Sequence, residues 1–399
     1  MLKDLYQICT NCNTRYPIIQ AYPRCKRCNE PLEVELITKG MINRGDILKQ
    51  TILARYRDFL PFERIDEQVS LGEGFTPLVR AGEMAKRLGI DSLFIKDETQ
   101  NPTWSFKDRG TLLGVQHAIA LGYKKIGTVS TGNMAVSVAA YGAKGGFKTY
   151  ILVNSQLPEE KVAPITIYNP VLIRVEGDYD VLYYRSIEVG EEEGIYFVNS
   201  DVPFRVEGSK SIAYEICEQL GFDVPDYVIV PTSSGGNLRG IIKGFLEFKG
   251  AGLISRMPTF VCAQAEGCSP IVKAGQQGRE KIERVIDPHT IAHAIENPNP
   301  PSGNEILRKM REYKGIFVAV SDEEILQAQR SLAGEGIFGQ PAAAVPLAAL
   351  QRLMDKKVIT GDKKVVCIVT GSGLKDTKAL EGHSFRVTSC KIDELHAYM

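Results

Sequence analysis

The sequence predicts an α/β protein built from two doubly wound parallel-sheet domains. Strand-like and helix-like segments alternate from Leu93 onward. The strand-like segments are continuous apolar runs, such as residues 365–369, which is typical of strands covered by helices on both faces. There are more such runs than one sheet of ordinary size holds, and 399 residues suffice for two or three domains. We therefore expect a ligand site between two domains.

Composition narrows the class of protein. The chain is 44% hydrophobic and 24% charged, as in ordinary globular proteins. Its 48 basic and 48 acidic residues give no net charge, which argues against nucleic acid or an anionic membrane as partner. The first residues lack an apolar leader, and no run approaches the roughly 18 apolar residues of a membrane span. These features predict a cytoplasmic protein without a membrane partner.

Residues 1–38 are expected to form a zinc ribbon. Cys9 and Cys12 form one Cys-x-x-Cys pair, and Cys25 and Cys28 form another after twelve intervening residues. Two such turns can place four thiolates tetrahedrally around one zinc ion, and a site filled by four protein ligands is structural. The alternative is four unrelated reduced cysteines, but this segment has too few apolar residues to fold without a stabilising cross-link such as a bound metal ion. Three of the remaining cysteines are expected to be buried apolar side chains: Cys217, Cys262 and Cys367.

The elements follow in order. A helix is expected over Asp46 to Leu60, then a glycine-rich turn at residues 71–78 and a helix from Gly82 to Leu88. The expected strands of the alternating part are Ser92–Asp97, Lys125–Ser130, Thr149–Asn154, Val171–Val175, Tyr196–Ser200, Tyr227–Pro231, Thr259–Gln264 and Val365–Thr370. The expected helices are residues 107–121, 132–144, 179–190, 207–220, 238–248, 304–313 and 322–334.

A glycine turn at residues 233–237 follows the strand that ends at Pro231 and begins a helix. Its members are Ser233, Ser234, Gly235, Gly236 and Asn237. Successive backbone N–H groups, serine hydroxyls and a helix N-terminus suit a phosphate group. The turn lacks both the Walker ending and the dinucleotide glycine spacing, so a smaller phosphorylated ligand is favoured over a nucleotide. Alone, it could also be a plain strand-to-helix turn, which is the less favoured interpretation.

Three further positions lie at strand ends or helix starts. Lys107 stands in the run Ser105 to Gly110 near a helix N-terminus, where the helix dipole favours the neutral amine that can form a Schiff base. Alone, such a lysine is more often a solvated helix start. Asn133 follows a strand and can offer its amide to a ligand or cap a helix. Thr370 ends the last apolar strand, at the edge where open α/β sheets bind ligands.

Together these positions suit a cofactor with an aldehyde, a phosphate and a ring nitrogen, and pyridoxal phosphate is such a cofactor. The chain resembles the fold type II, or tryptophan synthase β-like, family of pyridoxal enzymes, and within it the threonine synthases. The segments that carry the resemblance span about residues 70–376: 73–78, 101–110, 130–133, 199–200, 205–208 and 370–376. A cysteine ribbon ahead of the catalytic part also occurs in this family.

The resemblance implies a role for each position. Lys107 would carry the cofactor and move protons, Asn133 would bind the 3-oxygen of the ring, the glycine turn its phosphate, and Thr370 the ring nitrogen. The reaction implied is a lyase reaction in which O-phospho-L-homoserine and water give L-threonine and phosphate, by γ-elimination and β-addition. A second phosphate site, for this amino-acid substrate, would use Ser105, Asn199, Ser200 and Arg205.

The resemblance also implies an arrangement of the whole chain. Residues 39–109 and 196–376 would form the large cofactor-binding domain, residues 110–195 a smaller mobile domain, and residues 377–399 a tail. Members of the family commonly form homodimers.

Four residues depart from the family pattern: Trp104 stands where glycine is usual, Met134 where threonine is common, Ser234 where asparagine is frequent, and Ser372 where histidine occurs. All four are expected near the substrate. They keep two alternatives open. One is a paralogue that performs β- or γ-replacement, or threonine or serine dehydration, on another activated amino acid. The other is a non-catalytic ligand-binding protein with this fold.

Overall fold

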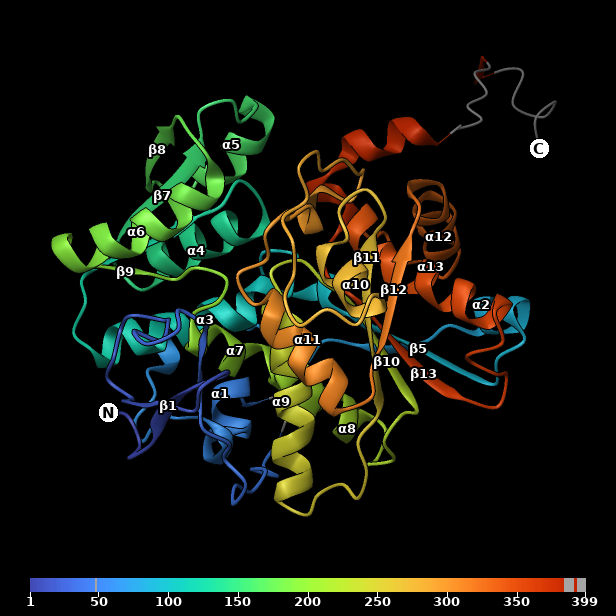
Figure 1. The fold of residues 1–399 in the computed structure, drawn as a ribbon, viewed down its shortest axis with the longest axis horizontal. Coiled ribbons are helices and arrows are strands. Elements are labelled where there is room, and N and C mark those ends of the chain that lie inside the picture. The colour runs from blue at the N-terminus through green and yellow to red at the C-terminus, as the bar shows by residue number, and fades with distance from the viewer. Residues whose placement is uncertain (47–48, 384–390, 393–399) are drawn as a thin grey trace.

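Two largely parallel sheets form the centre of the molecule in a computed structural model that describes residues 1–46, 49–383 and 391–392 (Figure 1). Six strands form the larger sheet, in the spatial order β12 (Ile316–Val320), β11 (Thr259–Ala265), β10 (Tyr227–Pro231), β13 (Lys364–Val369), β5 (Ser92–Asp97) and β4 (Leu78–Arg80). All neighbours in it are parallel except β4, which is antiparallel to β5.

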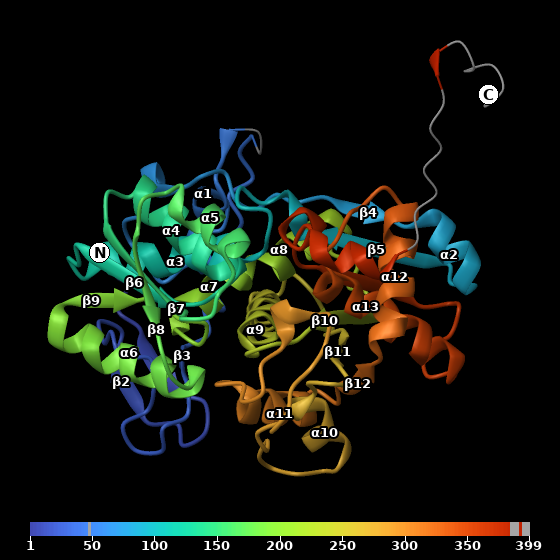
Figure 2. The ribbon, with the colours of Figure 1, turned by 90° about the horizontal axis from the view of Figure 1, so that it is seen from above.

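The smaller sheet is entirely parallel, in the order β8 (Val171–Val175), β7 (Lys148–Asn154), β6 (Lys125–Val129) and β9 (Ile195–Phe197). A third, antiparallel sheet comes from the N-terminal segment, in the order β2 (Arg15–Pro17), β1 (Tyr6–Cys9) and β3 (Leu32–Val34). Both views place this N-terminal sheet on the same side of the molecule as the four-stranded sheet (Figures 1 and 2).

Helices occupy most of the connections between strands. They are α1 (Ile52–Arg55), α2 (Gly82–Leu88), α3 (Lys107–Ala120), α4 (Asn133–Lys144), α5 (Glu159–Thr166), α6 (Tyr179–Glu193), α7 (Pro203–Ser209), α8 (Ser211–Gln219), α9 (Gly236–Gly250), α10 (Pro270–Gln276), α11 (Gly303–Glu312), α12 (Asp322–Gly334) and α13 (Pro341–Asp355).

The apolar runs of the large sheet supply cores on both faces. Val228 and Val366 contact the cluster that includes α8 and α9, whereas Ile229 and Cys367 contact the cluster built with α2, α12 and α13. Because side chains alternate between the faces of a strand, only an uninterrupted apolar run can fill both cores. The predicted α/β class with two parallel sheets is confirmed.

Several predictions of single elements are wrong or incomplete. The helix expected over Asp46 to Leu60 is limited to the single turn of α1, because Thr51 caps a helix that starts only at Ile52, and a 3₁₀ turn at Arg57–Phe59 follows it. Residues 47–48 lie outside the described part. The apolar spacing that suggested one long helix is satisfied by these two short turns. Elements not expected from the sequence are β12, α5, α7, α10 and α13.

The cysteines outside the ribbon behave as expected. Cys217, Cys262 and Cys367 are fully buried, and Cys268 is buried too, while Cys390 lies outside the described residues. Within the described residues, no helix is long and apolar enough to cross a membrane.

Candidate active site

The loop before α3 is fastened to the end of β13. The Phe106 N–H donates to the carbonyl of Thr370 at 3.0 Å, and the Ser372 N–H donates to the carbonyl of Trp104 at 3.0 Å. Ser105 therefore faces Gly371 in an isolated bridge. This pairing joins two segments that are far apart in sequence and brings Lys107 to the strand end that bears Thr370.

Lys107 is the first residue of α3 and has no ion-pair partner within the described residues. Its Nζ lies 4.4 Å from the centre of the Phe106 ring. Burial, together with the nearby cations Arg205 and Lys375, lowers the pKa of this amine to about 7. An amine that is largely neutral near pH 7 is the form that attacks an aldehyde.

The next two residues of the run hold the loop rather than face a ligand. Asp108 accepts hydrogen bonds from the Thr103 N–H at 2.7 Å and the Thr103 hydroxyl at 2.6 Å. Arg109 is fully buried, with Nε 2.6 Å from Glu98 and Nη1 2.6 Å from Glu215. These bonds fix the first turn of α3 to the end of β5 and to α8, so Lys107 is placed by a charge-paired scaffold.

Asn133, at the start of α4, reaches across to the large sheet. Its Nδ2 donates to Oε1 of Gln340 at 3.2 Å. A Cβ on Gly371 would lie 3.3 Å from this same Nδ2 and 3.1 Å from Nε2 of Gln340, so the three residues converge at the end of β13. The structure thus brings Asn133, Thr370 and Lys107 together.

The glycine turn begins α9 without a side-chain cap. Gly235 has a φ of +97°, a left-handed conformation that glycine adopts without strain, and its Cβ would lie 2.9 Å from Ile306. Neither polar atom of the Asn237 amide has a hydrogen-bond partner in the part of the chain that the structure describes. Unfilled donors at a helix N-terminus suit an anion. Ser233 is partly buried, and Ser234 is buried, its carbonyl accepting from the Ser302 N–H at 3.1 Å.

Arg205, in α7, is a buried cation beside Lys107. Its Nη1 donates to the Thr111 hydroxyl at 2.9 Å and its Nη2 to the Lys107 carbonyl at 3.4 Å. No carboxylate pairs with it among the described residues, and burial lowers its pKa to about 10. Helix α7 crosses α3 at close range, since a Cβ on Gly208 would lie 2.0 Å from the Arg109 carbonyl. A buried guanidinium without a carboxylate partner suits an anionic ligand.

The other expected substrate residues differ in their surroundings. Ser105 is buried and its Oγ has no partner within the described residues. The carbonyl of Ser200 lies against the glycine turn, 2.8 Å from where a Cβ on Gly236 would stand. Asn199 is engaged by the small sheet instead. Its Oδ1 accepts from the Val129 N–H at 3.0 Å, and its Nδ2 donates to Ser186 at 3.0 Å.

The residues that depart from the family pattern also have defined places. Trp104 has a φ of +61° and is 53% exposed, so the glycine usual in the family would suit its left-handed backbone. Met134 is buried at the second position of α4. Ser372 caps a short 3₁₀ turn (Gly373–Lys375), its Oγ accepting from the Leu374 N–H at 3.2 Å.

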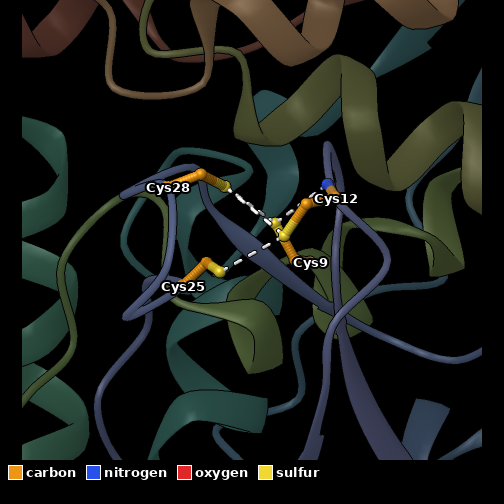
Figure 3. A group of neighbouring side chains, drawn as sticks. All are labelled: Cys9, Cys12, Cys25 and Cys28. Atoms are coloured by element: carbon orange, nitrogen blue, oxygen red, sulfur yellow. Dashed lines mark hydrogen bonds between the residues drawn. The ribbon is translucent and has the colours of Figure 1, made fainter.

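The four ribbon cysteines converge on one point (Figure 3). Their sulfur atoms all lie within 4.8 Å of one another, with Cys9 3.4 Å from Cys28 and Cys12 3.6 Å from Cys25. Four sulfurs at about 2.3 Å from one zinc ion would be about 3.8 Å apart, so the cluster fits that ion. The Arg27 N–H also donates to the Cys25 sulfur at 3.4 Å, and such a bond stabilises a thiolate that binds a metal ion.

Sequence reasoning assigned no role to two residues at this site. Lys375 donates to the Thr103 carbonyl at 2.6 Å, and burial lowers its pKa to about 8. Gln340 precedes α13, and its N–H donates to the Gly371 carbonyl at 3.0 Å. Lys375 falls inside a matched motif and could have been singled out from it as a cation near the site. Gln340 had no local signal, because only the tertiary fold places it beside Asn133.

Comparison with known proteins gives consistent matches. The family model "Pyridoxal-phosphate dependent enzyme" matches residues 69–371. Threonine synthase from Methanocaldococcus jannaschii is 41% identical over 386 residues, which cover 94% of each chain. Threonine synthase from Methanosarcina acetivorans is 38% identical over 93% of this chain and 92% of that protein. The enzyme of the same name from Mycobacterium tuberculosis is 36% identical over 82% of this chain and 88% of that one.

Solved structures show the same fold at lower identity. Diaminopropionate ammonia lyase from Escherichia coli superposes with a TM-score of 0.67 at 19% identity, covering 79% of this chain and 88% of that one. Maize serine racemase gives a TM-score of 0.66 at 21% identity, covering 77% and 91%. The family model, the relatives and the shared fold agree with one another. The chain therefore belongs to the pyridoxal-phosphate-dependent enzymes and, within them, to the threonine synthase family of lyases.

Proposed function

We propose that this enzyme converts O-phospho-L-homoserine and water into L-threonine and inorganic phosphate, with pyridoxal phosphate as cofactor. One observation supports this assignment above the others. Arg205 is buried beside Lys107 without a carboxylate partner among the described residues, and the glycine turn lies beside Ser200, which belongs to the same segment, 199–205, as Arg205. The fold thus offers anion-binding groups at two neighbouring places. A phosphorylated cofactor and a phosphorylated substrate together require two such places.

The residues present fit pyridoxal phosphate. The lowered pKa of Lys107 favours the neutral amine that forms a Schiff base. Helix α9 begins without a side-chain cap, and the Asn237 amide has no partner among the described residues, which suits the phosphate of the cofactor. Asn133 and Thr370 would hold the ring from the ends of two different sheets. When bound, pyridoxal phosphate supplies an electron sink that stabilises negative charge at Cα of an amino acid.

The protein's own residues would then move protons and hold charge. Lys107, released from the cofactor, would take protons from Cα and Cβ of the substrate. Arg205 and the Ser105 hydroxyl would hold the phosphate as its bond to Cγ breaks, because a fixed cation in a buried site stabilises the leaving anion. A proton delivered to Cγ, the hydroxyl of a water molecule added at Cβ and a proton returned to Cα complete threonine. Asn199 would support this segment through its bonds to β6 and Ser186.

The test combines product detection with one substitution. Purified enzyme loaded with cofactor should release phosphate from O-phosphohomoserine and form threonine in equal amounts. Arg205→Met should raise KM by about tenfold to a hundredfold, the usual cost of losing a charged contact to a phosphate. The matched control is Arg55→Met, which removes a cation paired with Glu218 away from the site. Normal turnover by Arg205→Met would contradict the phosphate role.

Trp104 and Met134 favour keeping a second candidate, a paralogue that acts on another activated amino acid or dehydrates threonine or serine. The same assay separates the two. Release of a 2-oxo acid from threonine or serine, without phosphate release from O-phosphohomoserine, would identify a dehydratase. Absence of any absorbance from a lysine Schiff base would instead indicate a non-catalytic protein.

We also propose that Cys9, Cys12, Cys25 and Cys28 hold one structural zinc ion, which the convergence of their sulfur atoms supports (Figure 3). A homodimeric state and a cytoplasmic location stay predictions, and so does the division into domains at residues 38, 109, 195 and 376. Sedimentation analysis would test the dimer directly.

A further inference from the structure

Arg24 joins the N-terminal ribbon to the segment that precedes Arg205. It stands next to Cys25, and its Nη1 lies 2.5 Å from Oδ2 of Asp201. Both side chains are buried, Arg24 being 5% exposed and Asp201 0%. Tyr183 of α6 donates its hydroxyl to the other carboxylate oxygen, and the Asp201 N–H donates back to that hydroxyl at 3.3 Å. Asp201 is thus held from two elements outside its own segment.

The same arginine also contacts the loop that supports the glycine turn. Its Nη1 donates to the Pro301 carbonyl at 3.3 Å, and the neighbouring Ser302 donates its N–H to the Ser234 carbonyl at 3.1 Å. Its Nε donates to the Asn29 carbonyl at 2.8 Å, which orients the guanidinium from within the ribbon. Arg24 therefore lies between the supports of both proposed phosphate sites.

Asp201 lies inside the turn that begins α7. The Val202 N–H donates to the Asn199 carbonyl at 3.2 Å, and the Arg205 N–H donates to the Val202 carbonyl at 2.9 Å. A shift of Asp201 would consequently move Ser200 on one side and Arg205 on the other. A buried carboxylate that loses its cation is strongly destabilised, so the turn would move to bring Asp201 toward water.

We propose that Arg24 is a positioning residue for the substrate phosphate, acting through Asp201 on the 199–205 segment, so that the ribbon forms part of the substrate-binding structure. This inference rests on the proposed function, which assigns the phosphate of O-phosphohomoserine to Arg205. Arg24 does not touch that phosphate itself. Its loss should therefore weaken substrate binding while the chemistry at Lys107 continues.

The experiment measures KM and kcat for O-phosphohomoserine, together with competitive inhibition by inorganic phosphate, on the full cofactor-loaded enzyme. Arg24→Met should raise both KM and the inhibition constant of phosphate by about tenfold, with kcat changed by less than about threefold. Arg24→Lys should recover part of the loss, because it keeps the charge. Asp201→Asn keeps the shape of its partner and should give the same pattern as Arg24→Met.

Arg308→Met is the matched control. Arg308 joins the same ribbon to α11 through Glu30 at 2.8 Å and, among the described residues, makes no hydrogen bond or ion pair with the 199–205 segment. It should leave KM and phosphate inhibition unchanged. An equal rise in both constants for Arg308→Met would mean that general loosening of the ribbon is responsible, which would overturn the inference. Unchanged constants for Arg24→Met and Asp201→Asn would overturn it as well.

The Arg205→Met variant separates the inference from the proposed function. If Arg205→Met leaves KM and phosphate inhibition unaltered, the phosphate site fails and the inference fails with it. If Arg205→Met raises KM and the inhibition constant of phosphate and Arg24→Met raises neither, the proposed function stands and only the positioning role is rejected.

Discussion

Lys107 shares its buried surroundings with two other cations, Arg205 and Lys375, and this grouping favours its neutral amine. A protonated neighbour raises the free energy of a second positive charge, so each cation lowers the pKa of Lys107 beyond the effect of burial. Asp108 instead raises the pKa of Lys375 against the effect of burial, and it holds Thr103 by two hydrogen bonds.

Removing one of these cations should shift the pH dependence of cofactor attachment. The amine reacts when neutral, so the rate of Schiff-base formation should fall as pH drops through the pKa of about 7. Lys375→Met removes a charge that lowers this pKa, so the pKa should rise and the midpoint of the rate should move to higher pH. The measurement is absorbance after adding pyridoxal phosphate to cofactor-free enzyme across pH. Lys378→Met, an exposed lysine nearby, should leave the midpoint in place.

The position of some site residues could be predicted from the sequence, whereas the contacts of others could not. The proximity of Lys107, Thr370 and Asn133 was predictable because each follows or begins an element whose end is visible in the sequence, and parallel strands collect such ends at one edge. Their roles toward the cofactor stay predictions. The structural role of Arg109 was not predictable. Its partners Glu98 and Glu215 come from separate elements, and nothing in their local sequence marks them as its partners.

At the scale of elements, the close crossing of α3 and α7 sets the distance between Lys107 and Arg205. Gly110 and Gly208 line this crossing, and a Cβ on either of them would meet a backbone carbonyl of the opposite helix at 3.1 Å or less. Helix α7 was not expected as a separate element, because its start at Pro203 and its break before Ser211 depend on packing rather than on periodicity. The ends of the strands could be predicted from the sequence, but the contact between α3 and α7 could not.

Filling the crossing should therefore affect both stability and substrate binding. Gly208→Ala places a methyl group against the Arg109 carbonyl, which cannot rotate away, and should lower the free energy of unfolding by about 1–3 kcal/mol. It should also raise KM, because Arg205 moves with α7. Gly334→Ala is the control, since no atom lies within 4 Å of its Cβ position and alanine favours a helix by at most about 1 kcal/mol. Denaturant unfolding and steady-state kinetics would measure both effects, and equal stability of the two variants would contradict the packing argument.

At the scale of the whole molecule, the ribbon is attached to the body by buried and half-buried charges. Arg239 of α9 donates to the Leu32 carbonyl at 2.8 Å, and Lys309 of α11 lies 3.1 Å from Glu33. These contacts hold β3 against the helices beside the large sheet. The ribbon itself has a small apolar core of Cys9, Cys25 and Leu32, so its own fold depends on the cysteine cluster.

Substitution of one ribbon cysteine should lower the zinc content without lowering the binding of the cofactor. The native protein should contain about one zinc per chain, and Cys25→Ser should lose most of it, because three remaining thiolates bind less tightly. The midpoint of thermal unfolding should fall while the absorbance of the bound cofactor is kept. Cys268→Ser, a buried cysteine outside the ribbon, should retain its zinc. A metal-free native protein of unchanged stability would contradict the zinc assignment.

The two sheets must also move relative to one another for substrate to enter, if Asn133 contacts the cofactor from one side and Thr370 from the other. The contacts from α4–α6 to the rest of the described chain include the bond of Asn133 to Gln340 and two exposed ion pairs, Arg284 to Asp178 and Lys378 to Glu160. They also include two buried tyrosine hydroxyls, of Tyr141 and Tyr183, which donate to Glu73 and Asp201. Exposed ion pairs contribute little because water screens them. Opening of the segment 110–195 would therefore have to break chiefly the buried hydrogen bonds, and we expect this segment to close when the phosphate of the substrate binds Arg205.

Hydrogen exchange measured by mass spectrometry on cofactor-loaded enzyme would detect this closure. Adding inorganic phosphate should slow amide exchange at the start of α4, where Asn133 and Met134 lie, because closure removes these N–H groups from water. Exchange in α12, on the far face of the large sheet, should stay constant and serves as the internal control. The Arg205→Met variant should show no slowing at α4, since the phosphate then lacks the cation that holds it. Slowing that persists in this variant would mean that phosphate closes the molecule from another site, and no slowing in the native enzyme would mean that the segment does not close on phosphate.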